Sequence, residues 1–191
     1  MLSEDRIYDI FQTTGAMLKG HFKLTSGKHS DQYFQCAQVL QQPHYCEELC
    51  QELARRFQHT GVETVIGPAM GGILVSYELA RALKVRSIFA ERENGKMTLR
   101  RGFSLKPGEK VIVAEDVITT GGSVKEVIEV VKEQGAEVVG VAVLVNRSGG
   151  KADMGVTTEA LITTSVVTYD PENCPLCQQG TPAVKPGSRE I

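Results

Sequence analysis

The sequence has no excess of positive charge and no hydrophobic run long enough to cross a bilayer. Its 191 residues carry a formal net charge of −2, whereas nucleic-acid-binding proteins are usually basic overall. Its apolar stretches are all shorter than the roughly 20 residues of a membrane-spanning helix, and the first residues lack a signal-peptide pattern. These absences predict a cytoplasmic protein that binds neither nucleic acid nor a membrane.

The two common nucleotide-binding loops are also absent. The sequence contains neither G-x-x-x-x-G-K-[ST] nor G-x-G-x-x-G, the phosphate-binding fingerprints of P-loop and dinucleotide-binding proteins. No internal repeat, linker or low-complexity segment divides the chain, so its length indicates one domain, 1–191. The five cysteines are an odd number, and in a cytoplasmic protein we expect reduced thiols.

One stretch, residues 111–123, combines the features of a ligand-binding turn. Val111 to Val113 form a short β-branched run that is typical of a buried strand. Two acids, Glu115 and Asp116, follow this run, and the sequence Thr-Thr-Gly-Gly-Ser occupies 119–123. The apolar residues after the turn have helical spacing. The order is therefore strand, acidic pair, glycine-rich turn and helix.

The turn and the start of the helix suit a phosphate group. Ser123 and Glu126 have the spacing of a capping box, which predicts that the helix begins at Ser123. Glycines let the backbone approach a ligand closely, and the first N–H groups of a helix have no partners within it. Three hydroxyl side chains can donate to the same phosphate oxygens: Thr119, Thr120 and Ser123.

The two acids need a different partner, because a carboxylate repels phosphate. Ionised carboxylates only accept hydrogen bonds, which suits paired ribose hydroxyls or a hydrated magnesium ion. A sugar diol beside a phosphate predicts a ribose 5-phosphate ligand. A solvated strand end with an ordinary turn is the simpler alternative, but the combination of acids, hydroxyls, glycines and cap favours phosphate binding.

A second glycine-rich turn and a cationic loop come earlier in the chain. The strand Val62 to Ile66 leads into Gly67 to Gly72 and a helix from about Ile73 to Leu83, where either another anion site or a plain tight turn fits. Residues 91–102 form a polar loop with four cations: Arg92, Lys96, Arg100 and Arg101. Ligands of a parallel sheet collect at the carboxyl ends of its strands. We therefore expect a mobile β-ribbon that closes as a lid, with a solvated hairpin as the alternative.

Outside this centre, the sequence predicts a helix over Ser3 to Thr14, a hairpin turn at Ser26 to Lys28 and a helix from about Tyr45 to Gln58. A long apolar strand, Val138 to Val145, ends at Asn146 and Arg147. Arg147 could be solvated, but at this sheet edge we favour a bidentate role with a carboxylate ligand.

Two cysteine pairs have metal-ligand spacing. Cys46 and Cys50 share one face of a predicted helix, where small buried apolar groups are the simpler explanation. Cys174 and Cys177 form a C-x-x-C, which is half of a zinc site with no evident second half. Its position among prolines is atypical of a redox motif. We expect packed thiols, then a shared metal, then redox chemistry, and the sequence does not settle the role.

Residues 111–123 resemble the phosphoribosyl pyrophosphate (PRPP) signature of the type I phosphoribosyltransferases. Other segments resemble the members of that family that act on orotate. The resemblance implies an α/β fold with a central parallel sheet of about five strands flanked by helices. The core would span about 45–150, and a small hood would come from about 1–40 and 153–191. The implied reaction is orotate plus PRPP giving orotidine 5′-monophosphate and pyrophosphate, in pyrimidine synthesis. The alternatives are a purine phosphoribosyltransferase and a non-catalytic PRPP-binding regulator.

The resemblance also implies residue roles. Lys96 would be the catalytic lysine, donated across a homodimer interface, with Glu115 and Asp116 also in the catalytic centre. Residues implied to bind PRPP are Arg92, Lys96, Glu115, Asp116, Val117, Ile118, Thr119, Thr120, Gly121, Gly122, Ser123, Gly71 and Gly72. Residues implied to bind orotate are Thr119, Arg147, Tyr33 and Phe34. Magnesium would be held mainly through PRPP and water.

The chain departs from the family pattern at several positions. Thr25 and Gly71 stand where some orotate enzymes have lysine. Glu93 and Thr98 stand where the enteric type has a lysine and a histidine. Those contacts do not transfer, so pyrophosphate would depend more on backbone groups and on cations from elsewhere. Two neighbouring lysines could substitute at Thr25: Lys23 or Lys28.

Overall fold

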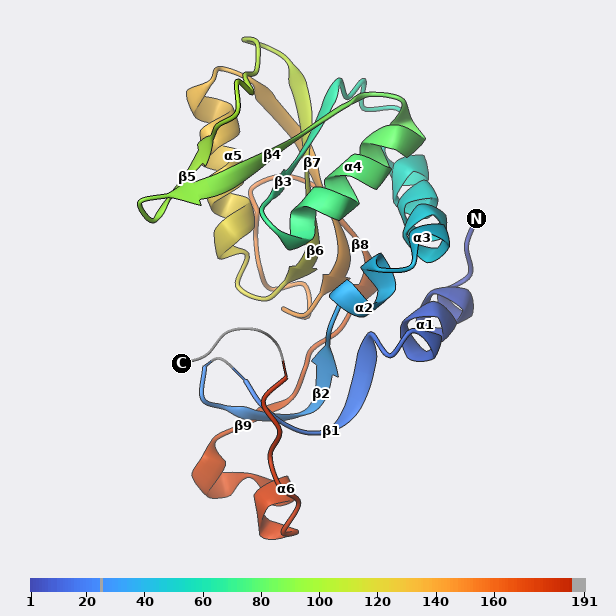
Figure 1. The fold of residues 1–191 in the computed structure, drawn as a ribbon, viewed down its shortest axis with the longest axis vertical. Helices are drawn as coiled ribbons and strands as arrows, with labels where there is room; N and C mark the ends of the chain where they lie inside the picture. The colour runs from blue at the N-terminus through green and yellow to red at the C-terminus, as the bar shows by residue number, and fades with distance from the viewer. Residues whose placement is uncertain (25, 187–191) are drawn as a thin grey trace.

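The computed structural model describes residues 1–24 and 26–186, which form two β-sheets (Figure 1). The larger sheet has the strand order β5-β4-β3-β6-β7-β8, and the smaller sheet has the order β1-β2-β9. Five neighbouring strands of the larger sheet run parallel, and β5 is antiparallel to β4 at one edge. The α/β fold with a parallel sheet and a hood, defined here as the β1-β2-β9 sheet with its C-terminal extension, is confirmed.

The strands are β1 (Met17–Lys23), β2 (His29–Phe34), β3 (Thr64–Pro68), β4 (Arg86–Glu93), β5 (Lys96–Leu99), β6 (Lys110–Ile118), β7 (Glu137–Asn146), β8 (Thr158–Thr163) and β9 (Thr168–Tyr169). The helices are α1 (Glu4–Thr13), α2 (Ala37–Leu40), α3 (Pro43–Arg56), α4 (Gly71–Leu83), α5 (Gly122–Glu133), the 3₁₀ turn η1 (Pro171–Asn173) and α6 (Pro175–Gln178). Of the helices in this part of the chain, none combines the length and the apolar character needed to cross a membrane.

The larger sheet is buried on both faces because its strands alternate apolar side chains between two core clusters. In β6, Ile112 and Ala114 belong to the cluster that includes α1, α3 and α4. Val111 and Val113 belong to the cluster around α5. This alternation is the period-two pattern of a strand covered on both sides. Ligands are therefore left to the carboxyl ends of the strands.

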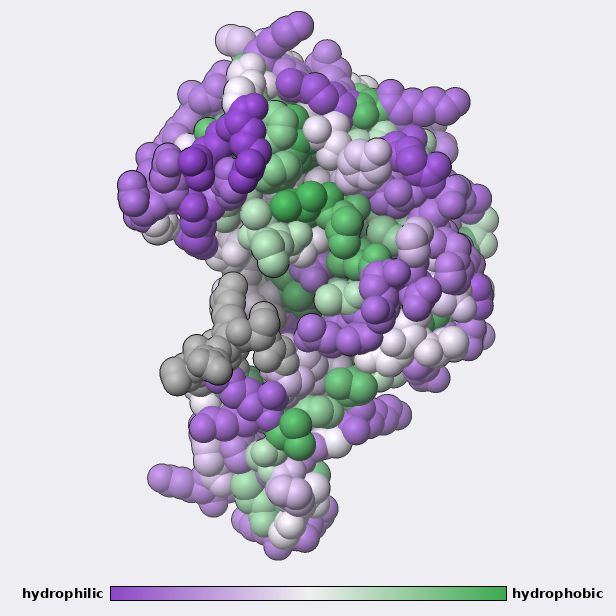
Figure 2. Space-filling model, in the orientation of Figure 1, coloured by the Kyte–Doolittle hydropathy of each residue, from purple (hydrophilic) through white to green (hydrophobic). Residues whose placement is uncertain are grey.

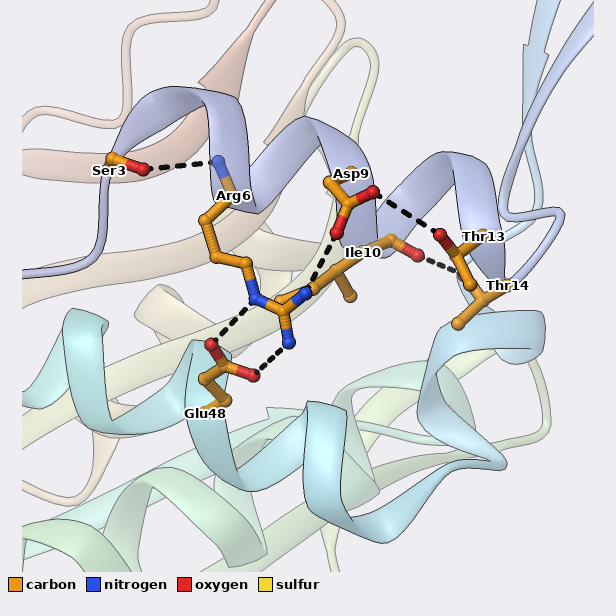
Figure 3. Close-up of polar contacts among 7 residues, drawn as sticks. All are labelled: Ser3, Arg6, Asp9, Ile10, Thr13, Thr14 and Glu48. Atoms are coloured by element: carbon orange, nitrogen blue, oxygen red, sulfur yellow. Dashed lines mark hydrogen bonds and ion pairs between the residues drawn. The ribbon is translucent and has the colours of Figure 1, made fainter.

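The N-terminal helix α1 is capped as predicted and is tied to α3. The Ser3 hydroxyl accepts a hydrogen bond from the Arg6 N–H at 3.2 Å. The Arg6 guanidinium donates two hydrogen bonds of 3.0 Å to the Glu48 carboxylate of α3 (Figure 3). Ile10 and Phe11 of α1 are fully buried beneath this contact. The helix therefore closes one end of the core.

The predicted capping box at Ser123 is wrong. Helix α5 begins at Gly122, its N-cap is Gly121 with a φ of 80°, and no side chain caps it. Glu126, the expected partner, instead accepts a hydrogen bond from Arg92 of β4 at 2.8 Å. Local spacing alone could not show that a distant arginine competes for this carboxylate.

The predicted strand and hood boundaries also need correction. Strand β6 continues through Ile118, so Glu115 and Asp116 lie within the strand rather than after it. The segment expected to begin the C-terminal part of the hood at residue 153 instead contributes β8, which pairs in parallel with β7 in the larger sheet. Strand β9 joins the hood sheet through β2, and Val184 adds an isolated bridge to β1. Thr25, one of the positions at which the chain departs from the family pattern, lies outside the described residues.

Candidate functional site

A cavity of about 250 Å³ lies at the turn that connects the carboxyl end of β6 to the start of α5. It is lined by Arg92, Glu115, the segment 117–124 and Glu126. The lining residues are the carboxyl end of the central strand, the glycine-rich turn and the first turn of the helix. Most of the PRPP-binding positions expected from the sequence are therefore brought together in one place.

The start of α5 is built to receive an anion. Lys125 N–H donates to Gly121 O at 2.9 Å and is the first backbone donor of the helix. The N–H groups immediately before it have no helical partner and carry the positive end of the helix dipole. Thr119 and Thr120 are exposed beside them. A phosphate of one ligand fits this set of donors.

Gly121 is required here for two physical reasons. Its φ of 80° lies in the left-handed region, which side chains other than glycine rarely adopt. A Cβ at this position would also overlap the Met154 side chain. The turn can therefore keep its shape only with glycine at this point.

The two acids form a buried pair beside the turn. Burial, with the neighbouring Asp116 charge, raises the pKa of Glu115 to about 9. Burial also raises the pKa of Asp116. Asp116 N–H donates to Glu115 Oε1 at 3.1 Å, and Val117 N–H donates to Asp116 Oδ1 at 2.8 Å. In the ligand-free protein the pair therefore retains a proton at neutral pH, because two negative charges cannot both be held there.

The second glycine turn, between β3 and α4, packs directly on this acidic pair. A Cβ added at Gly71 would lie 2.7 Å from the Asp116 carboxyl atoms, and one at Gly72 would lie 2.9 Å from Ala114 O. A side chain at Gly71 would thus push against Asp116. This close approach places the turn's backbone beside the acidic pair.

The expected β-ribbon is present as strands β4 and β5. Two of its cations, Arg92 and Lys96, lie in different places. Arg92 lines the 250 Å³ cavity and pairs with Glu126 of α5 at 2.7 Å. Lys96 does not line it; its side chain is 77% exposed, and its Nζ is 4.0 Å from a Glu133 carboxylate oxygen. A separate cavity of about 600 Å³ lies between the ribbon and α5. Within one chain, the ribbon therefore brings Arg92 to the site and leaves Lys96 outside it.

Arg147, directly after β7, is a half-buried cation facing the hood. Its Nε is buried and has no hydrogen-bond partner among the described residues. Its guanidinium carbon is 5.8 Å from the centroid of the Tyr33 ring. Burial lowers the pKa of Arg147, yet a guanidinium stays charged in proteins. A half-buried guanidinium whose buried Nε has no partner in the described chain suits an anion, and a planar carboxylate matches its geometry.

The remaining predicted contacts lie close to Arg147. Arg147 N–H donates to Ile118 O at 2.8 Å, so this arginine is anchored to the turn that carries Thr119. Phe34 is buried, with its ring 6.2 Å from that of Phe11. The Phe34 side chain belongs to the core, so only its backbone groups could reach a ligand.

Comparison with known proteins gives consistent matches. The sequence model of the family described as phosphoribosyl transferase domain matches residues 36–158. The orotate phosphoribosyltransferase of Desulforamulus reducens is 74% identical over 190 residues, covering 100% of both chains. That of Pelotomaculum thermopropionicum is 67% identical with the same coverage. The crystal structure of the Aeropyrum pernix orotate phosphoribosyltransferase has a TM-score of 0.67 at 29% identity, covering 82% of this chain and 93% of that chain.

Proposed function

The chain belongs to the phosphoribosyltransferase family, and we propose that its site transfers the 5-phosphoribosyl group from PRPP to orotate. The products are orotidine 5′-monophosphate and pyrophosphate, in the pathway to pyrimidine nucleotides. Similarity to orotate phosphoribosyltransferases extends over the full length of the chain. Neither the purine enzyme nor the non-catalytic regulator is favoured.

The observation that supports orotate most directly is the buried, unpartnered Nε of Arg147. Orotate carries a carboxylate, which can take two parallel hydrogen bonds from a guanidinium. The base would lie between Arg147, Thr119 and the Tyr33 side of the hood. A purine base has no carboxylate and would leave the buried Nε donor without a partner, which costs its desolvation.

PRPP would occupy the 250 Å³ cavity with its 5′-phosphate at the start of α5. The hydroxyls of the ribose would be held by Glu115 and Asp116. The pyrophosphate would extend toward the β3–α4 turn, where Gly71 and Gly72 expose backbone, and toward Arg92. In this placement the N–H groups and Arg92 face the phosphates of PRPP, and the carboxyl groups face its ribose hydroxyls.

Magnesium fits this site as a companion of PRPP. Glu115 and the partly buried Asp116 supply the hard oxygen ligands that magnesium prefers, directly or through water. Burial raises the pKa of both acids, and a bound cation would favour their ionised forms. A bound magnesium ion supplies positive charge that neutralises the leaving pyrophosphate.

The reaction needs charge stabilisation rather than a strong base. Departure of pyrophosphate leaves an oxocarbenium-like ribosyl centre, and orotate is already anionic, so no general base is required. The carboxylates of Glu115 and Asp116 orient the sugar and stabilise the positive charge that develops on it. Cations at the leaving group, Arg92 and a lysine, stabilise the pyrophosphate as the bond breaks.

The lysine comes from a second subunit in our proposal, because Lys96 lies outside the cavity of its own chain. A homodimer is supported by apolar side chains exposed on and just before α4: Met70 (83%), Leu74 (51%) and Tyr77 (64%). Figure 2 shows hydrophobic residues gathered over this helix, and such patches often mark interfaces. The cytoplasmic location expected from the sequence remains a prediction.

The proposed activity is tested by incubating the protein with PRPP, magnesium and one base at a time. We expect the ultraviolet absorbance of orotate to fall only when PRPP is present. Omission of PRPP is the control for contaminating activities. Turnover of adenine, guanine or hypoxanthine in place of orotate, or turnover of no base, would contradict the proposal.

A further inference from the structure

Four side chains with metal-ligand atoms meet in the hood, outside the cavity at the β6–α5 turn. His21 lies on β1, His29 begins β2, and Cys174 and Cys177 lie at the start and in the body of α6. Their ligand atoms all lie within 4.8 Å of one another. Both histidines and Cys174 are buried, and Cys177 is exposed. Two histidines therefore supply the second pair of metal ligands that the C-x-x-C lacks in the sequence. His21 lies 153 residues before Cys174, and His29 lies 148 residues before Cys177.

The spacing of these atoms approximates a tetrahedron. Cys174 Sγ is 3.5 Å from His21 Nε2, and Cys177 Sγ is 3.3 Å from His29 Nδ1 and 3.8 Å from His21 Nε2. Zinc bonds of about 2.0–2.3 Å in tetrahedral geometry give ligand separations of roughly 3.3–3.8 Å. The two nitrogens are closer, at 2.8 Å, so a bound ion would move them apart by about half an ångström on the same estimate.

The protonation of His21 suits a metal ligand. Its Nδ1 lies 2.7 Å from Thr181 O, and a carbonyl oxygen can only accept a hydrogen bond. Nδ1 therefore carries the proton, and Nε2 presents a lone pair to the cluster. A metal-binding histidine is usually oriented by a hydrogen bond of this kind from its other nitrogen.

The C-terminal segment has little else to hold it in place. Among the described residues, neither hydrophobic core cluster includes a residue beyond Val166. Strand β9 has two residues, and Val184 adds backbone hydrogen bonds to His21 and Lys23. Figure 1 shows α6 projecting from the hood, away from the larger sheet. Small units that cannot bury a sufficient core are commonly stabilised by a structural metal.

We propose that His21, His29, Cys174 and Cys177 bind one structural zinc ion that fastens the C-terminal segment to the β1–β2 hairpin. Two sulfur and two nitrogen ligands in tetrahedral arrangement favour zinc over magnesium or calcium. Four protein ligands leave no open position for substrate, which is typical of a structural rather than a catalytic site. If the proposed function holds, the ion also steadies β2, which carries Tyr33 opposite Arg147.

Metal analysis tests this proposal without reference to activity. The full chain, expressed in zinc-supplemented medium and purified without chelator, is expected to contain one zinc ion per chain by mass spectrometry of the metal. Replacement of both site cysteines (Cys174→Ala with Cys177→Ala) should abolish binding. The matched control removes the two buried cysteines of α3 (Cys46→Ala with Cys50→Ala) and should keep the ion. Absence of zinc from the wild type, or its retention by the site variant, would overturn the proposal.

Cobalt substitution separates loss of a ligand from loss of the fold. Cobalt in place of zinc should give a thiolate-to-cobalt charge-transfer band and the visible bands of a tetrahedral ion. Cys177→His keeps four ligands, so it should keep the tetrahedral bands and lose about half of the thiolate intensity, since one of two sulfurs remains. A wild-type protein that shows no thiolate band with cobalt, or that forms a Cys174–Cys177 disulfide while excluding metal, would contradict the proposal. These readouts stay valid even if orotate turnover fails.

Discussion

The guanidinium carbon of Arg147 lies 5.8 Å from the centre of the Tyr33 ring. Arg147 directly follows β7 of the larger sheet, and Tyr33 belongs to β2 of the hood. This cation–π contact is at the usual distance limit of about 6 Å. It joins the two sheets at the point where the Nε of Arg147 has no other partner in the described chain.

Replacement of Arg147 by alanine should weaken orotate use without a comparable effect on PRPP. Loss of a charge-assisted hydrogen-bonded pair costs about 1.5–3 kcal/mol, or roughly 10- to 150-fold in kcat/KM for orotate. Steady-state kinetics with each substrate varied in turn measures the split. Arg55→Ala, which removes a half-exposed arginine of α3, is the control for general loss of charge. Equal losses for orotate and PRPP would remove Arg147 from base recognition.

The buried Glu115 should make the ligand-free protein less stable as the pH rises. Its pKa is about 9 in the folded chain and about 4.3 when unfolded. Between these two pKa values the folded state binds one more proton than the unfolded state. The stabilisation that this proton gives is complete below the lower pKa and is lost as the pH approaches 9. Urea unfolding from pH 5 to pH 9 should show this decline, and Glu115→Gln should remove most of it. Identical slopes in the two proteins would contradict the assignment.

Binding of PRPP with magnesium should release a proton near pH 7. The cation and the ribose hydroxyls both favour ionised carboxylates, whereas the free pair retains a proton because the pKa of Glu115 is raised to about 9. Titration calorimetry in two buffers of different ionisation enthalpy measures the number of protons released. Glu115→Gln should release fewer. Proton uptake by the wild type, or no exchange at all, would show that the acids do not ionise on binding.

Mixing two inactive variants should restore activity if Lys96 acts across subunits. Lys96→Ala should lower kcat more than PRPP affinity, and Asp116→Asn should disable the site itself. Random exchange in a dimer would place one intact site in half of the molecules, which gives roughly a quarter of wild-type activity. Each variant incubated alone is the control. No recovery after exchange confirmed by mass spectrometry would place Lys96 in its own chain's site or outside catalysis.

Alanine at Gly121 should harm the protein more than alanine at Gly150. Both glycines have a φ of 80°, but a Cβ at Gly121 would overlap Met154, while one at Gly150 has nothing within 4 Å. The shared backbone strain costs about 1–3 kcal/mol, so the difference in melting temperature isolates the overlap. Gly121→Ala should also weaken PRPP binding, since the turn at α5 would shift. Equal effects at the two positions would show that the Met154 side chain can move aside without a cost in stability.

The local motifs of this site could be predicted from the sequence because they depend on neighbours in the chain. The order of strand, acids, glycines and helix at residues 111–123 needs only β-branched residues, glycine and helical periodicity. The β4–β5 ribbon likewise follows from its Asn94-Gly95 turn. The capping box at Ser123 failed because Arg92, 34 residues from Glu126, takes that carboxylate.

Long-range partnerships were beyond local patterns. Nothing in the sequence spacing connects Tyr33 with Arg147, or His21 with Cys174, because the fold alone brings these pairs together. The sequence places residues 153–191 in the hood, because the threonine-rich segment that forms β8 carries no local signal that shows which sheet it joins. The sequence thus predicts the phosphate-binding turn and the carboxylate role of Arg147, whereas the placement of Arg147 opposite Tyr33 required the structure.

The hood's hairpin lies early in the chain, yet the segments that pair with it follow after the whole larger sheet. Strand β2 pairs with β9 at Tyr169, and Lys23 N–H donates to Val184 O at 2.8 Å. During synthesis, the surface around Tyr33 stays unfinished while the larger sheet can already assemble. The surface that faces the base is therefore completed later in synthesis than the nucleotide cradle at residues 111–123.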